Sequence, residues 1–93
     1  MQLTCAIKQR ITNMCSEQNI TLNKLSSNSG LPYSTVFSII YGKSQSPKLS
    51  TILHICEGFN IDLKTFFDDP LFKDVDSEFE DKYTKNTELQ KAQ

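Results

Sequence analysis

Only two residues, Gly30 and Leu31, separate two short segments that have helical patterns. Gly30 is suited to end the first segment, because glycine enters the left-handed conformation that stops a helix at little cost. Pro32 is suited to begin the second, because the first position of a helix needs no backbone N–H donor. Two helices joined by so short a connection cannot pack antiparallel, so we expect them to cross at a steep angle, as in a helix-turn-helix.

The same kind of pattern predicts a helix before this pair. Ile7, Ile11 and Met14 recur at helical spacing and indicate a first helix over residues 3–18, which Asn19 then ends. Thr21 is a good N-cap for the second helix, because its hydroxyl can accept a hydrogen bond from a free backbone N–H.

Two more helices follow residues 32–41, which form the third. Asp62 is a suitable N-cap for the fifth helix, and Asn60 a suitable left-handed end for the fourth. The apolar positions that define these two helices are Leu49, Ile52, Leu53, Cys56 and Phe59 in the fourth and Leu63, Phe66 and Phe67 in the fifth. No segment has the alternation of a strand, so the sequence predicts an all-α fold.

The chain of 93 residues indicates a single small domain. Its apolar runs are only a few residues long, which excludes a membrane span and argues against a secretory signal. The three cysteines lack the spacing of a disulfide framework or a zinc site, which favours a reducing, cytoplasmic location. Cys15 and Cys56 fit better as small core residues.

Charge divides the chain into a basic body and an acidic tail. Residues 1–67 hold six basic against three acidic side chains, whereas residues 68–93 hold four basic against eight acidic ones. We therefore expect a domain over residues 1–67 and an acidic, partly helical C-terminal tail over residues 68–93. In the tail, Asp69 and Pro70 can start a turn, and Ser77 with Glu80 fits a capping box.

The segment "GLPYSTVFSIIYGK" (residues 30–43), with the helices around it, resembles the Cro/lambda-repressor type of helix-turn-helix DNA-binding domain, also called XRE-like. The resemblance covers residues 6–67, and it implies a five-helix, lambda-repressor-like fold in which residues 32–41 are the recognition helix. That helix would lie in the major groove of double-stranded DNA. The implied function is sequence-specific transcriptional regulation.

The resemblance also assigns roles along the chain. Val36 and Ile39 correspond to the buried pair of the recognition helix. The implied DNA contacts are Thr21 at the start of the second helix, Tyr33, Ser34, Phe37, Ser38 and Tyr41 on the recognition helix, and Lys43, Ser44, Gln45 and Lys48 in the loop after it. Phe37 can pack on a thymine methyl group, and the two lysines can neutralise phosphates.

Two features differ from the family pattern. Leu22 stands where glutamine commonly contacts a phosphate, and residues 32–41 include no Arg, Gln or Asn. An alternative function is therefore a protein-interaction module that uses Tyr33, Phe37 and Tyr41 as an exposed aromatic patch. Catalysis is not expected: His54, the one histidine, has no evident partner, and no cofactor or metal motif is present.

A homodimer is the expected assembly, because one domain with few base-reading side chains would bind a half-site weakly. We expect the fifth helix and the tail to supply the contact, because a monomer would not be expected to expose four apolar groups together: Phe66, Phe67, Leu71 and Phe72. Val75, Phe79 and Tyr83 extend this stripe. The competing hypothesis is that the tail folds back over Tyr33 and Phe37 and restrains DNA binding.

Overall fold

The structure, a computed structural model, describes residues 1–42 and 46–76. The described chain contains five α-helices and a short 3₁₀ helix: α1 (Leu3–Gln18), α2 (Leu22–Ser29), α3 (Tyr33–Tyr41), α4 (Leu49–Phe59), α5 (Leu63–Phe67) and η1 (Pro70–Phe72). Apart from one isolated β-bridge, between Gln2 and Asp76, these residues form no β-structure. The all-α prediction is confirmed.

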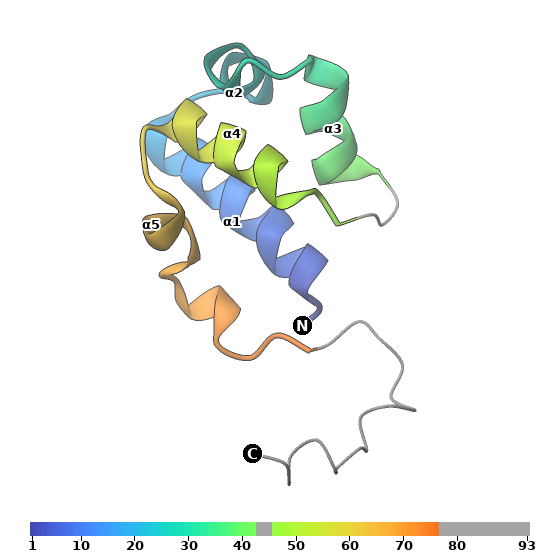
Figure 1. The fold of residues 1–93 in the computed structure, drawn as a ribbon, viewed down its shortest axis with the longest axis vertical. Helices are drawn as coiled ribbons and strands as arrows, with labels where there is room; N and C mark the ends of the chain where they lie inside the picture. The colour runs from blue at the N-terminus through green and yellow to red at the C-terminus, as the bar shows by residue number, and fades with distance from the viewer. Residues whose placement is uncertain (43–45, 77–93) are drawn as a thin grey trace, which may run out of the picture.

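The helices surround one core, and α4 overlaps α1 in the view of Figure 1. α2 packs on both α4 and α3, and α1 contacts α3 and η1. Figure 1 shows α3 on one side of the α1–α4 pair and α5 with η1 on the other side. The buried apolar side chains are Ala6, Ile7, Ile11, Met14, Cys15, Leu25, Val36, Ile39, Ile52, Ile55, Cys56, Phe59 and Phe66.

The predicted helix ends are confirmed by the backbone. Asn19, Gly30 and Asn60 follow α1, α2 and α4 with positive φ angles of 56°, 71° and 63°. Thr21 and Asp62 accept hydrogen bonds from the backbone N–H three residues further on, at 3.0 and 2.9 Å. These caps satisfy N–H groups that have no partner within the helix, so they fix where α2 and α5 start.

Two expectations about helix boundaries and faces were wrong in detail. Pro32 is the extended N-cap residue of α3, with ψ of 145°, and the helix begins at Tyr33. Leu49 and Leu53 belong to α4 but are exposed, whereas Ile55, between them and the helix end, is fully buried. Helical spacing alone did not distinguish the buried stripe of α4, which includes Ile55, from the neighbouring exposed stripe with Leu49 and Leu53.

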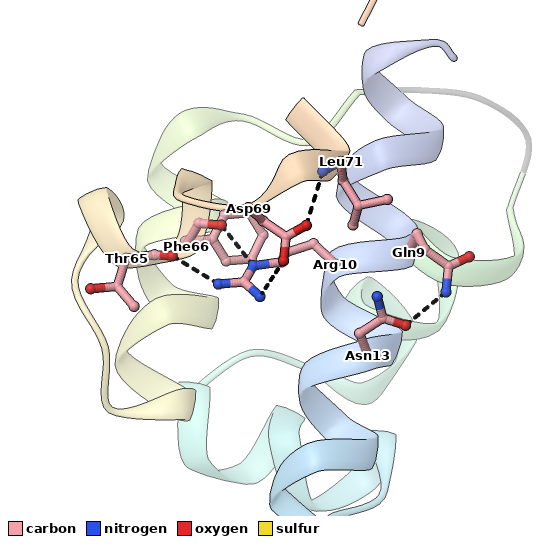
Figure 2. A network of polar contacts seen from close by, with 7 residues as sticks. All are labelled: Gln9, Arg10, Asn13, Thr65, Phe66, Asp69 and Leu71. Atoms are coloured by element: carbon pink, nitrogen blue, oxygen red, sulfur yellow. Dashed lines mark hydrogen bonds and ion pairs between the residues drawn. The ribbon is translucent and has the colours of Figure 1, made fainter. Parts of the chain in front are cut away.

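The Arg10 side chain of α1 binds α5 and Asp69, and so holds this segment against the first helix (Figure 2). Its Nε donates to the carbonyl of Phe66 at 2.7 Å, and one terminal nitrogen donates to the carbonyl of Thr65 at 2.8 Å. The other terminal nitrogen forms an ion pair with Asp69 at 3.0 Å. The Arg10 side chain is 9% exposed, so this guanidinium is buried with every interaction directed at α5 and the segment after it.

The prediction that Phe66, Phe67, Leu71 and Phe72 are exposed was wrong. Phe66 is fully buried in the core, and the other three are half-buried. The rings of Phe66, Phe67 and Phe72 pack on one another with centroids 5.0 to 6.1 Å apart. The short α5 and η1 turn these aromatic rings inward and onto one another, so they supply part of the monomer core instead of an open apolar surface.

The first part of the tail lies against α1. η1 packs on this helix, and the Asp76 backbone N–H donates to the carbonyl of Met1 at 2.9 Å. The segment leaves Tyr33 and Phe37 exposed. The expected stripe continues through Val75, which is half-buried, but Phe79, Tyr83 and the capping box fall outside the described residues.

α2 and α4 approach closely at Gly58. A Cβ atom placed on this glycine would lie 2.1 Å from Oγ of Ser29 and 3.1 Å from a Leu25 methyl carbon. Ser29 is buried, and its hydroxyl has no hydrogen-bond partner within residues 1–42 and 46–76. Gly58 is therefore required by the space between two helices, because its own φ angle is unexceptional.

Arg10→Ala should destabilise the domain by about 3 kcal/mol, because it leaves two carbonyls and a carboxylate without their buried donor. The melting temperature followed by circular dichroism should fall by about 12 °C or more. Lys64→Ala, an exposed change on α5, is the control and should leave the melting temperature within about 2 °C. Equal melting of Arg10→Ala and the parent would contradict the proposed fastening.

Gly58→Ala should also destabilise, although alanine is favoured over glycine in a helix by about 1 kcal/mol. Ser29→Ala removes an unpartnered hydroxyl and should change stability little. In the double variant, part of the Gly58→Ala loss should be recovered, since the closest clashing atom is gone. A double-mutant cycle from urea unfolding measures this coupling; a coupling of zero would show that the two sites do not meet as described.

Candidate nucleic-acid interface

α3 has one face in the core and the rest of its surface open. Val36 is fully buried and Ile39 is 8% exposed, which confirms the predicted buried pair. Ile40 is half-buried beside them. The remaining positions face outward, so α3 is held by one narrow apolar stripe, and its opposite side is available to a partner.

Three aromatic side chains form a ladder along the outward side of α3. Tyr33 and Phe37 are each 45% exposed and Tyr41 is 66% exposed. Their ring centroids lie 5.8 Å apart between Tyr33 and Phe37 and 4.8 Å apart between Phe37 and Tyr41. These spacings are typical of packed aromatic pairs, so each ring limits the rotation of the next. We refer to Tyr33, Phe37 and Tyr41 as the aromatic ladder.

A hydroxyl-lined groove runs beside the ladder. Its volume is about 500 Å³, and its lining residues are Ser34, Thr35, Ser38, Ile39, Gly42, Ser46, Pro47 and Thr51. These residues come from α3, from the segment that follows it and from the start of α4. The groove therefore places two of the expected DNA contacts, Ser34 and Ser38, next to the N-terminal end of α4.

Two helix N-termini bear the groups that bind anions well. At α2, the Thr21 carbonyl accepts its first helical bond from Leu25, and the first turn carries the exposed Lys24. At α4, the Lys48 carbonyl accepts bonds from Thr51 and Ile52, so the N–H groups before them point out of the helix end. Such N–H groups, with the positive end of the helix dipole, suit phosphate oxygens.

The C-terminal end of α3 is anchored to α1. Nζ of Lys8 lies 3.5 Å from the carbonyl oxygen of Gly42, where a cation complements the negative end of the helix dipole. A Cβ atom on Gly42 would lie 2.6 Å from the carbonyl oxygen of Ser38, so the chain can turn this tightly after α3 only at a glycine. Both features fix how α3 is presented.

The expected contact residues divide into two groups. The structure brings Tyr33, Ser34, Phe37, Ser38 and Tyr41 together on the outward side of α3. Thr21 caps α2 with its side chain, Lys48 directly precedes α4 without a side-chain cap, and both are exposed. Lys43, Ser44 and Gln45 lie outside the described residues.

Sequence reasoning missed Thr35, Gly42, Ser46 and Thr51, which line the groove, and Lys24 at the start of α2. Lys24 had a readable signal, because it lies in the first turn after a predicted N-cap. Thr51 had no such signal, because its approach to α3 depends on how the chain returns after Gly42.

Among the described residues, no three His, Cys, Asp or Glu side chains gather as a metal site would require. Burial raises the pKa of Cys15, and burial with the nearby Asp62 carboxylate raises that of Cys56 to about 11, so both thiols stay protonated at neutral pH. Both are core residues, as predicted.

His54 lies on the exposed surface of α4, 3.6 Å from Glu57. None of the described helices is long and apolar enough to cross a membrane.

Comparison with protein families identifies residues 10–70 as matching the Cro/C1-type HTH DNA-binding domain. The matched segment begins at Arg10 and ends in η1, so it includes α2, α3 and α4 and the ion pair between Arg10 and Asp69. No curated protein matches the chain significantly.

A solved structure has the same fold. The crystal structure of the prophage Lp1 protein 11 matches with a TM-score of 0.70 and 29% sequence identity, over 81% of this chain and the whole of that one. The fold found here is therefore shared, over 81% of this chain, with a prophage protein.

Proposed function

We propose that this chain, which belongs to the Cro/C1-type helix-turn-helix DNA-binding family, is a transcriptional regulator that binds specific duplex sequences with α3 in the major groove. The observation that carries the proposal is the open side of α3, which stands free of the core and borders the start of α4 along the groove. In this docking, the start of α3 reaches base edges and the helix ends beside it contact the two strands. The family is one of DNA-binding regulators and not of enzymes.

The proposed contacts follow the chemistry of each position. Phosphates on either side of the DNA major groove would be bound by Thr21 and Lys24 at α2 and by Lys48 at α4. Tyr33, Ser34, Phe37 and Ser38 would face bases, and Tyr41 would approach the backbone at the far end of α3. Lys43, Ser44 and Gln45 are proposed as further backbone contacts from their place in the sequence, directly after α3.

A selection of bound sequences from random duplex DNA tests this function directly. We expect it to recover a near-palindromic sequence with half-sites about 34 Å apart, one helical turn, because a two-fold dimer presents its two recognition helices at that spacing. Failure to enrich any sequence, together with absence of salt-dependent binding, would reject the proposal.

An aromatic protein-interaction surface is the second candidate, favoured by the exposure of the ladder. Salt separates the two functions. DNA binding should weaken steeply as salt rises, because each phosphate contact releases counterions. Binding of a protein through Tyr33, Phe37 and Tyr41 should persist or strengthen in high salt, because it depends on apolar contact.

Lys48→Ala, and the same change at Lys43, should each weaken DNA binding similarly on all sequences and reduce the slope of log K against log salt by about one. Lys64→Ala is the matched control, because Lys64 is exposed on α5, on the other side of the molecule from α3 (Figure 1). Fluorescence anisotropy over a salt series measures the slope. If Lys48→Ala and Lys64→Ala change the salt slope of DNA binding equally, the proposed docking is wrong.

We further propose that the protein is a homodimer in the cytoplasm and that residues after Asp76 supply the contact. Phe66 cannot contribute, because it is buried within the monomer. Apolar side chains remain further along the tail, at Phe79 and Tyr83.

Truncation after Asp76 tests the dimer and keeps Asp69, η1 and the Asp76 contact with Met1. We expect sedimentation to show a monomer that binds the selected duplex more weakly than the full chain. The competing hypothesis, a tail that restrains the recognition helix, predicts tighter binding after truncation, and that result would overturn the assignment.

A further inference from the structure

α3 lacks every side chain that makes a bidentate base contact. Its nine residues, YSTVFSIIY, include no Arg, Lys, Asn or Gln and no acidic residue. Guanine is usually read by Arg or Lys, adenine by Asn or Gln, and cytosine by a carboxylate. A helix of this composition in the major groove must obtain its specificity from something other than paired hydrogen bonds.

The ladder instead offers a restrained apolar surface. Phe37 has no hydrogen-bonding group and lies between Tyr33 and Tyr41, with centroid distances of 5.8 and 4.8 Å. Its ring is held at both sides and remains 45% exposed. The apolar group that base pairs present in the major groove is the methyl group on C5 of a pyrimidine, which thymine carries and cytosine lacks.

The hydroxyls beside the ladder do not add discrimination. Ser34 and Ser38 can each donate or accept a hydrogen bond. A rotating hydroxyl pairs equally well with O4 of thymine, an acceptor, and with the N4 amino group of cytosine, a donor. A cytosine that carries a C5-methyl group therefore presents to this side of α3 nearly the same surface as thymine.

We propose that α3 selects DNA through the C5-methyl groups of pyrimidines, so that it prefers thymine and accepts 5-methylcytosine in its place. This inference rests on the proposed function, because it assumes that α3 lies in the major groove. The chemical feature that the interface reads is then the C5-methyl group, and the affinity of a site depends on cytosine methylation.

The experiment uses the full chain and the tightest-binding duplex recovered by the selection described above. At each thymine of a half-site, four versions of the duplex are compared: thymine or uracil opposite adenine, and cytosine or 5-methylcytosine opposite guanine. At a contacted position, thymine should bind about fourfold more tightly than uracil, the value of burying one methyl group. 5-Methylcytosine should exceed cytosine by a similar factor, and two contacted positions should together give about fifteenfold.

The variant Phe37→Ala assigns the effect to the ladder. It should bring both ratios close to one at the contacted positions. Leu53→Ala is the matched control, because Leu53 is 41% exposed on α4 and is similarly apolar, yet it lies outside the proposed interface. This control should leave both ratios as they are in the parent protein.

Each other outcome has a distinct meaning. Equal affinity for the four versions, with the steep salt dependence retained, would overturn the methyl proposal and leave DNA binding intact. A preference for thymine over uracil without one for 5-methylcytosine over cytosine would overturn the interchange of the two bases. Persistence of both ratios in Phe37→Ala would overturn the assignment to the ladder. If the selection recovers no duplex, the proposed function itself fails, and this inference fails with it.

Discussion

The buried guanidinium of Arg10 holds α5 and Asp69 against α1, and the packing of the C-terminal part of the domain depends on it. Desolvating a charged side chain is costly unless its donors are paired, and Arg10 pairs with the carbonyls of Thr65 and Phe66 and with the Asp69 carboxylate. These partners all lie in the segment that brings Phe66 into the core. A helix of five residues has little stability of its own, so α5 depends on this anchorage and on the burial of that ring.

Closure of one side by Arg10 leaves the opposite side to α3. The turn through Gly30 and Leu31 leads from α2 into α3, and Val36 and Ile39 hold α3 to the core. Lys8 and the tight turn at Gly42 fix its far end. α3 is thus held at three places, its buried stripe, Lys8 and the turn at Gly42, which suits the proposed role of contacting base pairs in a fixed register.

The division of charge fits this arrangement. The described acidic residues of the tail follow α5, and Asp69 is taken up by Arg10. Lys24 and Lys48 remain exposed at the starts of the helices that flank α3. The net charge of the whole chain is −1 and hides this separation. Net charge is therefore a poor guide to nucleic-acid binding when the contact surface is a small part of the protein.

Local rules in the sequence determined the helices and most of their ends, because each depends on a few neighbouring residues. Gly30 and Asn60 were readable as left-handed ends and Asn19 as a helix end. Thr21 and Asp62 were readable as caps. The same rules identified α3, whereas its buried pair, Val36 and Ile39, was assigned from the family resemblance.

Only the tertiary structure decided which apolar faces are covered. Leu49 looked like a core residue and is exposed, whereas Phe66 looked available for a partner and is buried. The role of Arg10 is visible only in the structure, where its guanidinium donates to a carbonyl of α5 more than fifty residues away in the chain. Helical spacing shows which residues share a face. Which other helix packs against that face depends on the tertiary path of the chain, and no local sequence pattern encodes that path.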